Sequence, residues 1–263
     1  MHKHNYQPFQ TVSSCQREAI NRRFKLLLFL FIPFFILSCD TLDSHDSAAS
    51  SVFQYDFNES DHGWEAFFSD YNVDWGEKMK LHADYRALPE PLDTTTSAHY
   101  IRAVNHSGDV KMLFRRQVDG LEPNTSYQTS YTVRFATSAP SNCVGVGGPP
   151  GEAVKVIAAA SDLKPEAVIE EEPNEYYRLN LQQQNDSPEW YPNAILGDIA
   201  NSRDCEEGPE FEIKELVSDA AHGTVTTDID GRAWLLFGTR SGFEGRTDLY
   251  FTYFRAEFEK IDS

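Results

Sequence analysis

The stretch that decides the fold is Tyr127-Gln-Thr-Ser-Tyr-Thr-Val-Arg-Phe-Ala-Thr137. Every second position of this stretch forms one series, made up of Tyr127, Thr129, Tyr131, Val133 and Phe135. The positions between them, from Gln128 to Arg134, are polar or charged. Because successive residues of a strand point to opposite faces of a sheet, this alternation predicts an antiparallel strand with one buried face.

Similar strand-like segments recur on both sides of this stretch, separated by turn residues. They are residues 52–57, 64–68, 99–104, 110–118, 154–160, 176–181, 224–229, 234–239 and 248–258. Residues 194–199 and 211–217 fit either a short helix or a strand, and no segment shows a sustained helical period. The pattern predicts an all-β fold, an antiparallel β-sandwich with long loops, in a single domain over residues 52–263.

Three parts of this region resemble jelly-roll carbohydrate-binding modules of the galactose-binding-like kind. Phe53-Gln-Tyr-Asp-Phe-Asn-Glu-Ser-Asp-His-Gly-Trp64 is similar to their opening strand and Gly-Trp turn, and residues 121–135 are similar to their middle turn and long strand. Gly245-Arg-Thr-Asp-Leu-Tyr-Phe251 is similar to their closing strand. The resemblance implies a jelly roll and a carbohydrate ligand.

The same resemblance raises the question of a structural calcium ion. Such modules often carry an aspartate in the closing strand, where this chain has Thr252 or Tyr253. Around the first turn, oxygen ligands are available on Asp56, Asn58 and Asp61. The alternative is an ordinary turn rich in Asp and Asn. No other cofactor is expected.

A second pair of acidic residues, at Asp228 and Asp230, precedes Gly231. The first and last ligands of a calcium-binding EF-hand loop are missing, because Thr226 and Phe237 stand at those positions. We therefore expect a hairpin turn at Asp230-Gly231.

The N-terminus has the pattern of an export signal. Arg22-Arg23-Phe24-Lys25 precedes an apolar run over residues 26–37, which is shorter than the roughly 20 residues of a membrane-spanning helix. The run closes on Ile36-Leu37-Ser38-Cys39, which resembles the lipobox of bacterial lipoproteins. The resemblance implies a signal peptide at residues 1–38, a lipid on Cys39 and a flexible tether at residues 39–51. The expected location is the bacterial cell envelope, outside the cytoplasm.

The net charge narrows the range of partners. The chain carries 23 basic and 41 acidic residues, a net charge of −18. Removing residues 1–38 takes away five basic residues and one acidic residue, which leaves 18 against 40. Such a surface repels nucleic acid and anionic headgroups, so a nucleic-acid partner is disfavoured and membrane attachment depends on the lipid.

The four cysteines divide by position. Cys15 lies in the leader and Cys39 is assigned to the lipid, so Cys143 and Cys205 remain. Both lie among turn residues, and an exported compartment permits disulfides, so we expect them to pair. The alternative is two free thiols. A zinc site is not indicated, because neither cysteine has a second cysteine or a histidine at ligand spacing.

Two tryptophans lie among turn residues, where an exposed ring is unfavourable unless it binds something. Trp75 follows Asp74, and Trp190 lies between Glu189 and Tyr191. Sugars present flat apolar faces to such rings, while carboxylates bond their hydroxyl groups. These five residues are the candidate ligand-binding set. The alternative is that each ring packs back over the end of the sandwich.

The sequence shows no catalytic motif. There is no nucleophile elbow around Ser241 and no His-Glu-x-x-His, so no catalytic residue is assigned. The favoured function is a lipid-anchored binding module outside the cytoplasm, with carbohydrate as the candidate ligand. The alternatives are a structural envelope lipoprotein without a small-molecule site and a hydrolase that acts on polysaccharide.

Overall fold

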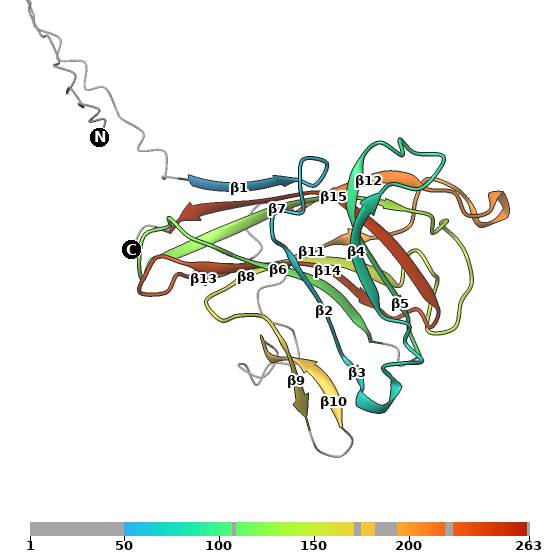
Figure 1. Ribbon diagram of the computed structural model, residues 1–263, viewed down its shortest axis with the longest axis horizontal. Coiled ribbons are helices and arrows are strands. Elements are labelled where there is room, and N and C mark those ends of the chain that lie inside the picture. Colours follow the sequence, from blue (N-terminus) through green and yellow to red (C-terminus); the bar gives the residue numbers. More distant parts are fainter. Residues whose placement is uncertain (1–49, 107–108, 171–174, 182–193, 219–222, 262–263) are drawn as a thin grey trace, which may run out of the picture. The chain divides into compact units, whose positions relative to one another are not determined.

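The computed structural model describes residues 50–106, 109–170, 175–181, 194–218 and 223–261, which all lie within one compact unit, Asp46–Ser263. This part of the chain is built from antiparallel sheets packed together, so the predicted β-sandwich is confirmed (Figure 1). None of the helices found among these residues has the length and apolar character needed to cross a bilayer.

The larger sheet has seven strands. Its main path runs β12-β7-β15-β5-β4, while β1 pairs with the second half of β15 and β13 pairs with the start of β7. The strands are β1 (Ser50–Asp56), β4 (His82–Ala87), β5 (Ser97–Val104), β7 (Ser126–Thr137), β12 (Glu212–Val217), β13 (Thr224–Thr226) and β15 (Arg246–Lys260). Strand β15 is the central strand of this sheet, because it pairs with β1, β5 and β7 along its 15 residues.

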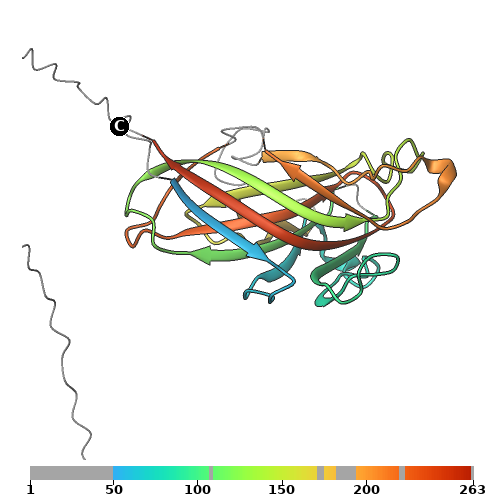
Figure 2. The same cartoon turned by 90° about the horizontal axis from the view of Figure 1, so that it is seen from above.

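The second sheet has five strands in the order β11-β8-β14-β6-β2, and it covers the inner face of the first (Figure 2). Its strands are β2 (Glu65–Ser69), β6 (Lys111–Val118), β8 (Val154–Ser161), β11 (Ala194–Asp198) and β14 (Ala233–Ser241). A small third sheet, β3-β10-β9, consists of β3 (Tyr71–Asn72), β9 (Ala167–Glu170) and β10 (Tyr176–Leu179). Two short 3-10 helices are η1 (Val73–Trp75) and η3 (Cys205–Glu207).

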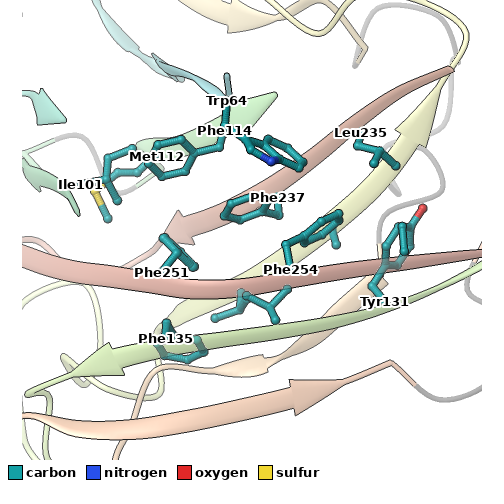
Figure 3. Packing of buried hydrophobic residues seen from close by; sticks show 14 of the residues in the cluster. Trp64, Ile101, Met112, Phe114, Tyr131, Phe135, Leu235, Phe237, Phe251 and Phe254 are labelled. Carbon is teal, nitrogen blue, oxygen red and sulfur yellow. The ribbon is translucent and has the colours of Figure 1, made fainter. Parts of the chain in front are cut away.

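The core lies between the two large sheets and is rich in aromatic rings (Figure 3). The five alternating residues of β7 that the sequence assigned to one face are all at most 2% exposed. Phe237 of β14 stacks on Phe254 of β15 at 4.7 Å between ring centroids, and on Phe114 of β6 at 5.3 Å. Ring pairs of this kind add to the free energy gained from burial, so they fix how the sheets face each other.

Several expectations need correction. Residues 82–87 form strand β4 although no strand was predicted there, and both ambiguous segments, 194–199 and 211–217, are strands rather than helices. The expected turn at Asp230-Gly231 is present, with the Gly231 N–H donating to the Asp228 carbonyl at 3.1 Å, but it joins β13 of the larger sheet to β14 of the second sheet, so the two strands do not form a hairpin.

Candidate functional site

The sequence-predicted sugar-binding residues fall in two places. Trp75 is partly buried and packs against the main core, with Lys78 Nζ 5.8 Å from the ring centroid, while Asp74 is exposed. Glu189, Trp190 and Tyr191 lie outside the described residues. The structure thus places Trp75 between core and surface, and the binding role of the set stays a prediction.

The predicted calcium residues are engaged in local hydrogen bonds. Asp56 Oδ1 accepts the backbone N–H of Asn58 at 2.9 Å, and Asp61 Oδ1 accepts that of Gly63 at 3.1 Å. Asn58 Oδ1 accepts the backbone N–H of Ser97 at 3.0 Å. Within the described ranges, no group of three or more His, Cys, Asp or Glu side chains is placed to hold a metal ion.

Cys143 and Cys205 are joined by a disulfide. The bond ties the loop that follows β7 to η3, and the same two segments meet at Ser141 and Asp204 through a single β-bridge. Asn142 Nδ2 donates to Asp204 Oδ2 at 3.1 Å. These contacts hold two long loops together at one end of the sandwich.

A cluster of aromatic and charged side chains lies on the outer face of the larger sheet, where β4, β5 and β15 pair. The register places Tyr100 opposite Asp84 and Tyr250, and Arg102 opposite His82 and Asp248. Their neighbours Ile101 and Leu249 belong to the core, so alternation directs these residues outward. We call this set the outer-face cluster; it consists of His82, Asp84, Arg86, Tyr100, Arg102, Arg246, Asp248 and Tyr250.

Asp248 is the centre of one half of this cluster. Arg246 donates to both of its carboxylate oxygens, at 2.5 Å from Nε and 2.9 Å from Nη2, and Tyr100 Oη donates to Oδ1 at 2.5 Å. Burial and then this hydrogen bond raise the pKa of Tyr100 to about 12. The hydrogen bond to Asp248 raises the pKa of Arg246 further above its usual value. Tyr100 therefore stays a neutral donor and Arg246 a cation at physiological pH.

Asp84 is the centre of the other half. Arg86 Nε donates to Asp84 Oδ1 at 2.6 Å and Arg86 Nη2 donates to Oδ2, so the pair is bidentate. The hydrogen bond from Arg86 holds the pKa of Asp84 below its usual value. The Arg86 guanidinium also lies 4.2 Å from the ring centroid of Tyr100, at cation–π distance. Both carboxylates of the cluster are thus paired anions.

The aromatic floor of the cluster continues toward β12. Tyr100 and Tyr250 have ring centroids 4.7 Å apart, and Phe211 meets Tyr250 edge to face at 5.4 Å. Tyr250 also packs in a small apolar cluster with Leu88 and Leu92 from the loop between β4 and β5. The loop forms one wall of the cluster, and on its floor the partly exposed rings of Phe211 and Tyr250 lie beside the buried ring of Tyr100 and the paired charges.

A pocket of about 220 Å³ opens beside the cluster at the end of the sandwich that carries the disulfide. Its lining consists of Ser138, Ala139, Pro140, Pro150, Ile199, Pro209, Phe243, Arg246, Thr247 and Asp248. We call it the end pocket. Apolar rings next to a few convergent polar groups are typical of ligand sites. Because Arg246 and Asp248 belong to both, the pocket and the outer-face cluster form one candidate site.

A second pocket of about 220 Å³ opens between the edge strands β2 and β4. His99 lines it and is buried, and its Nε2 lies 2.9 Å from the carbonyl oxygen of Asp61. Burial lowers the pKa of His99 below its ordinary value. This pocket has fewer charged groups than the outer-face cluster, so we do not assign it a ligand.

None of the outer-face cluster was proposed from the sequence. Its residues come from three strands, and the hydrogen bond between Tyr100 and Asp248 joins positions 148 residues apart. The available signal was the alternation of Asp248 and Tyr250 in the closing strand with residues that are buried. It identifies outward positions but not the strands beside them.

Comparisons with known proteins give weak similarities. No family model matches the chain, and no curated protein matches it in sequence. Among solved structures, the chain is similar to the enzymatically active domain of tailspike protein 4 of bacteriophage CBA120, with 12% identity and a TM-score of 0.28. It is similar to a Clostridium thermocellum endo-1,4-β-D-xylanase containing a carbohydrate-binding module, complexed with xylohexaose, with 12% identity and a TM-score of 0.35. The cleaved adhesin domain of Lys-gingipain from Porphyromonas gingivalis gives 11% identity and a TM-score of 0.33.

The matches cover similar shares of this chain but different shares of the others. They span 78%, 80% and 81% of this chain, respectively. The chain spans only 20% of the tailspike domain and 28% of the xylanase, but 99% of the adhesin domain.

Proposed function

We propose that this protein is a carbohydrate-binding module that a lipid on Cys39 anchors in the bacterial cell envelope, outside the cytoplasm. The observation that carries the binding proposal is the outer-face cluster, where tyrosine rings lie beside two Asp–Arg pairs, and where Arg246 and Asp248 also line the end pocket. Sugars combine apolar ring faces with hydroxyl groups. Rings supply stacking and fixed carboxylates and guanidinium groups supply hydrogen bonds, so the cluster matches both needs.

The cluster favours binding over hydrolysis. A glycosidase needs a protonated carboxyl group as general acid, usually one whose pKa is raised. Asp84 is instead held ionised by Arg86, and Asp248 accepts three hydrogen bonds from Arg246 and Tyr100. These two carboxylates are therefore better suited to orient a sugar than to donate a proton to it.

A glycan array and calorimetric titration test the binding proposal. We expect dissociation constants of roughly millimolar to micromolar, as for a shallow site with one or two stacking rings. Tyr250→Ala should weaken binding about tenfold, because the substitution removes a ring contact worth about 1 kcal/mol and disturbs its neighbours. The matched control is Tyr253→Ala. Tyr253 lies on the same face of β15, but its ring contacts the Arg134 guanidinium outside the cluster.

The absence of binding to every glycan tested would favour the structural envelope lipoprotein instead. Equal binding by the two tyrosine variants would move the site away from the outer-face cluster, and the surface that includes Trp75 would then be tested by Trp75→Ala.

The anchoring proposal has its own test. Cys39→Ser should abolish incorporation of labelled fatty acid and leave an unprocessed precursor or a protein released from the membrane fraction. Label that still enters this variant would exclude Cys39 as the lipid site.

A further inference from the structure

The outer-face cluster has a net positive charge, whereas the whole chain has a net negative charge. The cluster contains three arginines and two aspartates, whereas the chain has a net charge of −18. Arg246 pairs with Asp248, and Arg86 pairs with Asp84. One positive charge, that of Arg102, remains uncompensated inside the cluster.

Arg102 lies at the middle of the cluster. In the sheet register it stands between His82 of β4 and Asp248 of β15. Both oxygens of Asp248 are already occupied by Arg246 and Tyr100, which explains why Asp248 does not pair with Arg102. Among the residues that the structure describes, none forms an ion pair or a hydrogen bond with the Arg102 guanidinium, and its Nε is buried.

A buried donor without an acceptor is costly, and more so when the group is charged. An unpartnered buried group in a native structure calls for an explanation, and a bound ligand that completes the bonding is one such explanation. The guanidinium of arginine is planar and matches a carboxylate in a bidentate arrangement. An anion with the geometry of a carboxylate would therefore suit the Arg102 guanidinium as a partner.

Resting on the proposed function, we propose that the glycan bound by this site is acidic, a polymer containing uronic acid, and that Arg102 binds its carboxylate. The paired Arg86 and Arg246 flank this position and donate to neighbouring hydroxyl groups, while Tyr250 lies under the sugar ring. The acidic surface elsewhere repels the same polymer, so binding is confined to this face.

The test compares polymers that differ only in charge. Polygalacturonate is titrated beside its methyl-esterified form, which keeps the sugar but neutralises the carboxylate, and alginate and hyaluronate extend the panel of uronic acids. A neutral xylan serves as uncharged reference, and a sulfated galactan distinguishes sulfate from carboxylate. The variants are Arg102→Gln and Arg102→Lys. The control is Arg255→Gln, on the same outer face of β15 but paired with Glu257 outside the cluster.

We expect at least one uronic acid polymer to bind about tenfold or more tightly than the esterified and neutral polymers, as for a charge-assisted pair. The preference should fall as salt is added, because salt screens exposed charges. Arg102→Gln should abolish the preference, Arg102→Lys should retain part of it, and Arg255→Gln should keep it. Thermal unfolding of each variant checks that the fold is intact.

Other outcomes overturn the inference in distinguishable ways. Neutral polymers that bind as tightly as acidic ones, or a preference that survives in Arg102→Gln, would refute the role of Arg102 and leave carbohydrate binding standing. A preference for the sulfated galactan alone would refute the carboxylate assignment. No binding to any polymer would refute the proposed function as well.

Discussion

Two charged clusters in this molecule both pair aspartates with basic side chains but differ in their access to water. In the outer-face cluster, the side chains of Arg86 and Arg246 are 41% and 60% exposed. In the second cluster, where the small third sheet meets the second sheet, Lys111 and Asp70 are 0% exposed and their charged atoms lie 2.6 Å apart. The difference in burial determines what each cluster can do.

The buried cluster holds segments of the fold together. Asp70 has φ of +62°, accepts a hydrogen bond from Ser69 Oγ at 2.8 Å, and is also approached by Arg178 of β10 at 3.4 Å. Burial lowers the pKa of Lys111, against the opposing effect of Asp70. Charges taken from water must be matched within the protein. In the outer-face cluster, Arg86 and Arg246 remain in contact with water, so their ion pairs depend less on matching within the protein.

The largest predicted effect comes from breaking the buried cluster. Lys111→Met leaves Asp70 as a buried carboxylate without its closest cation, and we expect the free energy of unfolding to fall by about 3–5 kcal/mol. Urea denaturation measures it. The control is Lys155→Met, whose partner Asp198 lies 3.6 Å away at the surface, and which should lose no more than about 1 kcal/mol. Similar losses in both variants would remove the distinction between the clusters.

The second prediction concerns the disulfide beside the end pocket. Replacing Cys143 and Cys205 with serine opens a loop closed over 62 positions, and we expect the free energy of unfolding to fall by up to about 4 kcal/mol. Ligand affinity should fall too, because the bond holds the loop that contributes Pro140 and Pro150 to the pocket. Mass spectrometry of the unreduced exported protein should find one peptide pair containing both cysteines. Complete alkylation of the native protein would exclude the bond.

The third prediction uses pH. Burial depresses the pKa of His99 in the folded state below its ordinary value of 6.5, so the unfolded chain binds more protons than the folded one in that range. The contribution of His99 to stability is therefore present above about pH 6.5 and is lost as the pH falls through the folded pKa. The unfolding midpoint should decrease between neutral pH and about pH 5. His99→Gln should flatten this part of the profile, and an unchanged slope would contradict the assignment.

The smallest predicted effect comes from the outer-face cluster. Tyr100→Phe removes one hydrogen bond to Asp248 but leaves both bonds from Arg246, so stability should fall by only about 1 kcal/mol. Absorbance titration should show that the tyrosine with a pKa of about 12 has disappeared. A loss as large as that of Lys111→Met would mean that this cluster also holds the fold together.

The sequence predicted the fold better than the site. Strand β7 was recognisable because its alternation is local. Strand β4 was missed because His-Ala-Asp-Tyr-Arg-Ala has exposed residues on both faces, so its apolar alternation is weak. Trp234, which begins one of the predicted strand segments, is partly exposed on the outer face of the second sheet, with Lys164 Nζ 5.5 Å from its ring centroid.

The site depends on information that no single segment contains. Arg102 looks like an ordinary surface residue in the sequence, and its lack of a partner follows only from the register of β5 against β4 and β15. That register depends on pairings between strands more than 140 residues apart. The residue types alone show that arginines and aspartates are present. They do not show that Arg86 and Arg246 pair with the two aspartates of the cluster and that Arg102 does not.

The length of β15 sets how far the site stands from the start of the folded domain. Ser50, the first residue of β1, lies opposite Glu259, whereas Asp248 lies eleven positions earlier in β15. At about 3.3 Å per residue, this separation is about 36 Å. A polymer bound across the outer-face cluster, as we propose, would therefore lie about this far from the first residue of β1. Under that proposal the start of the domain leaves the ligand clear, so internal segments of a polymer would bind as well as its ends.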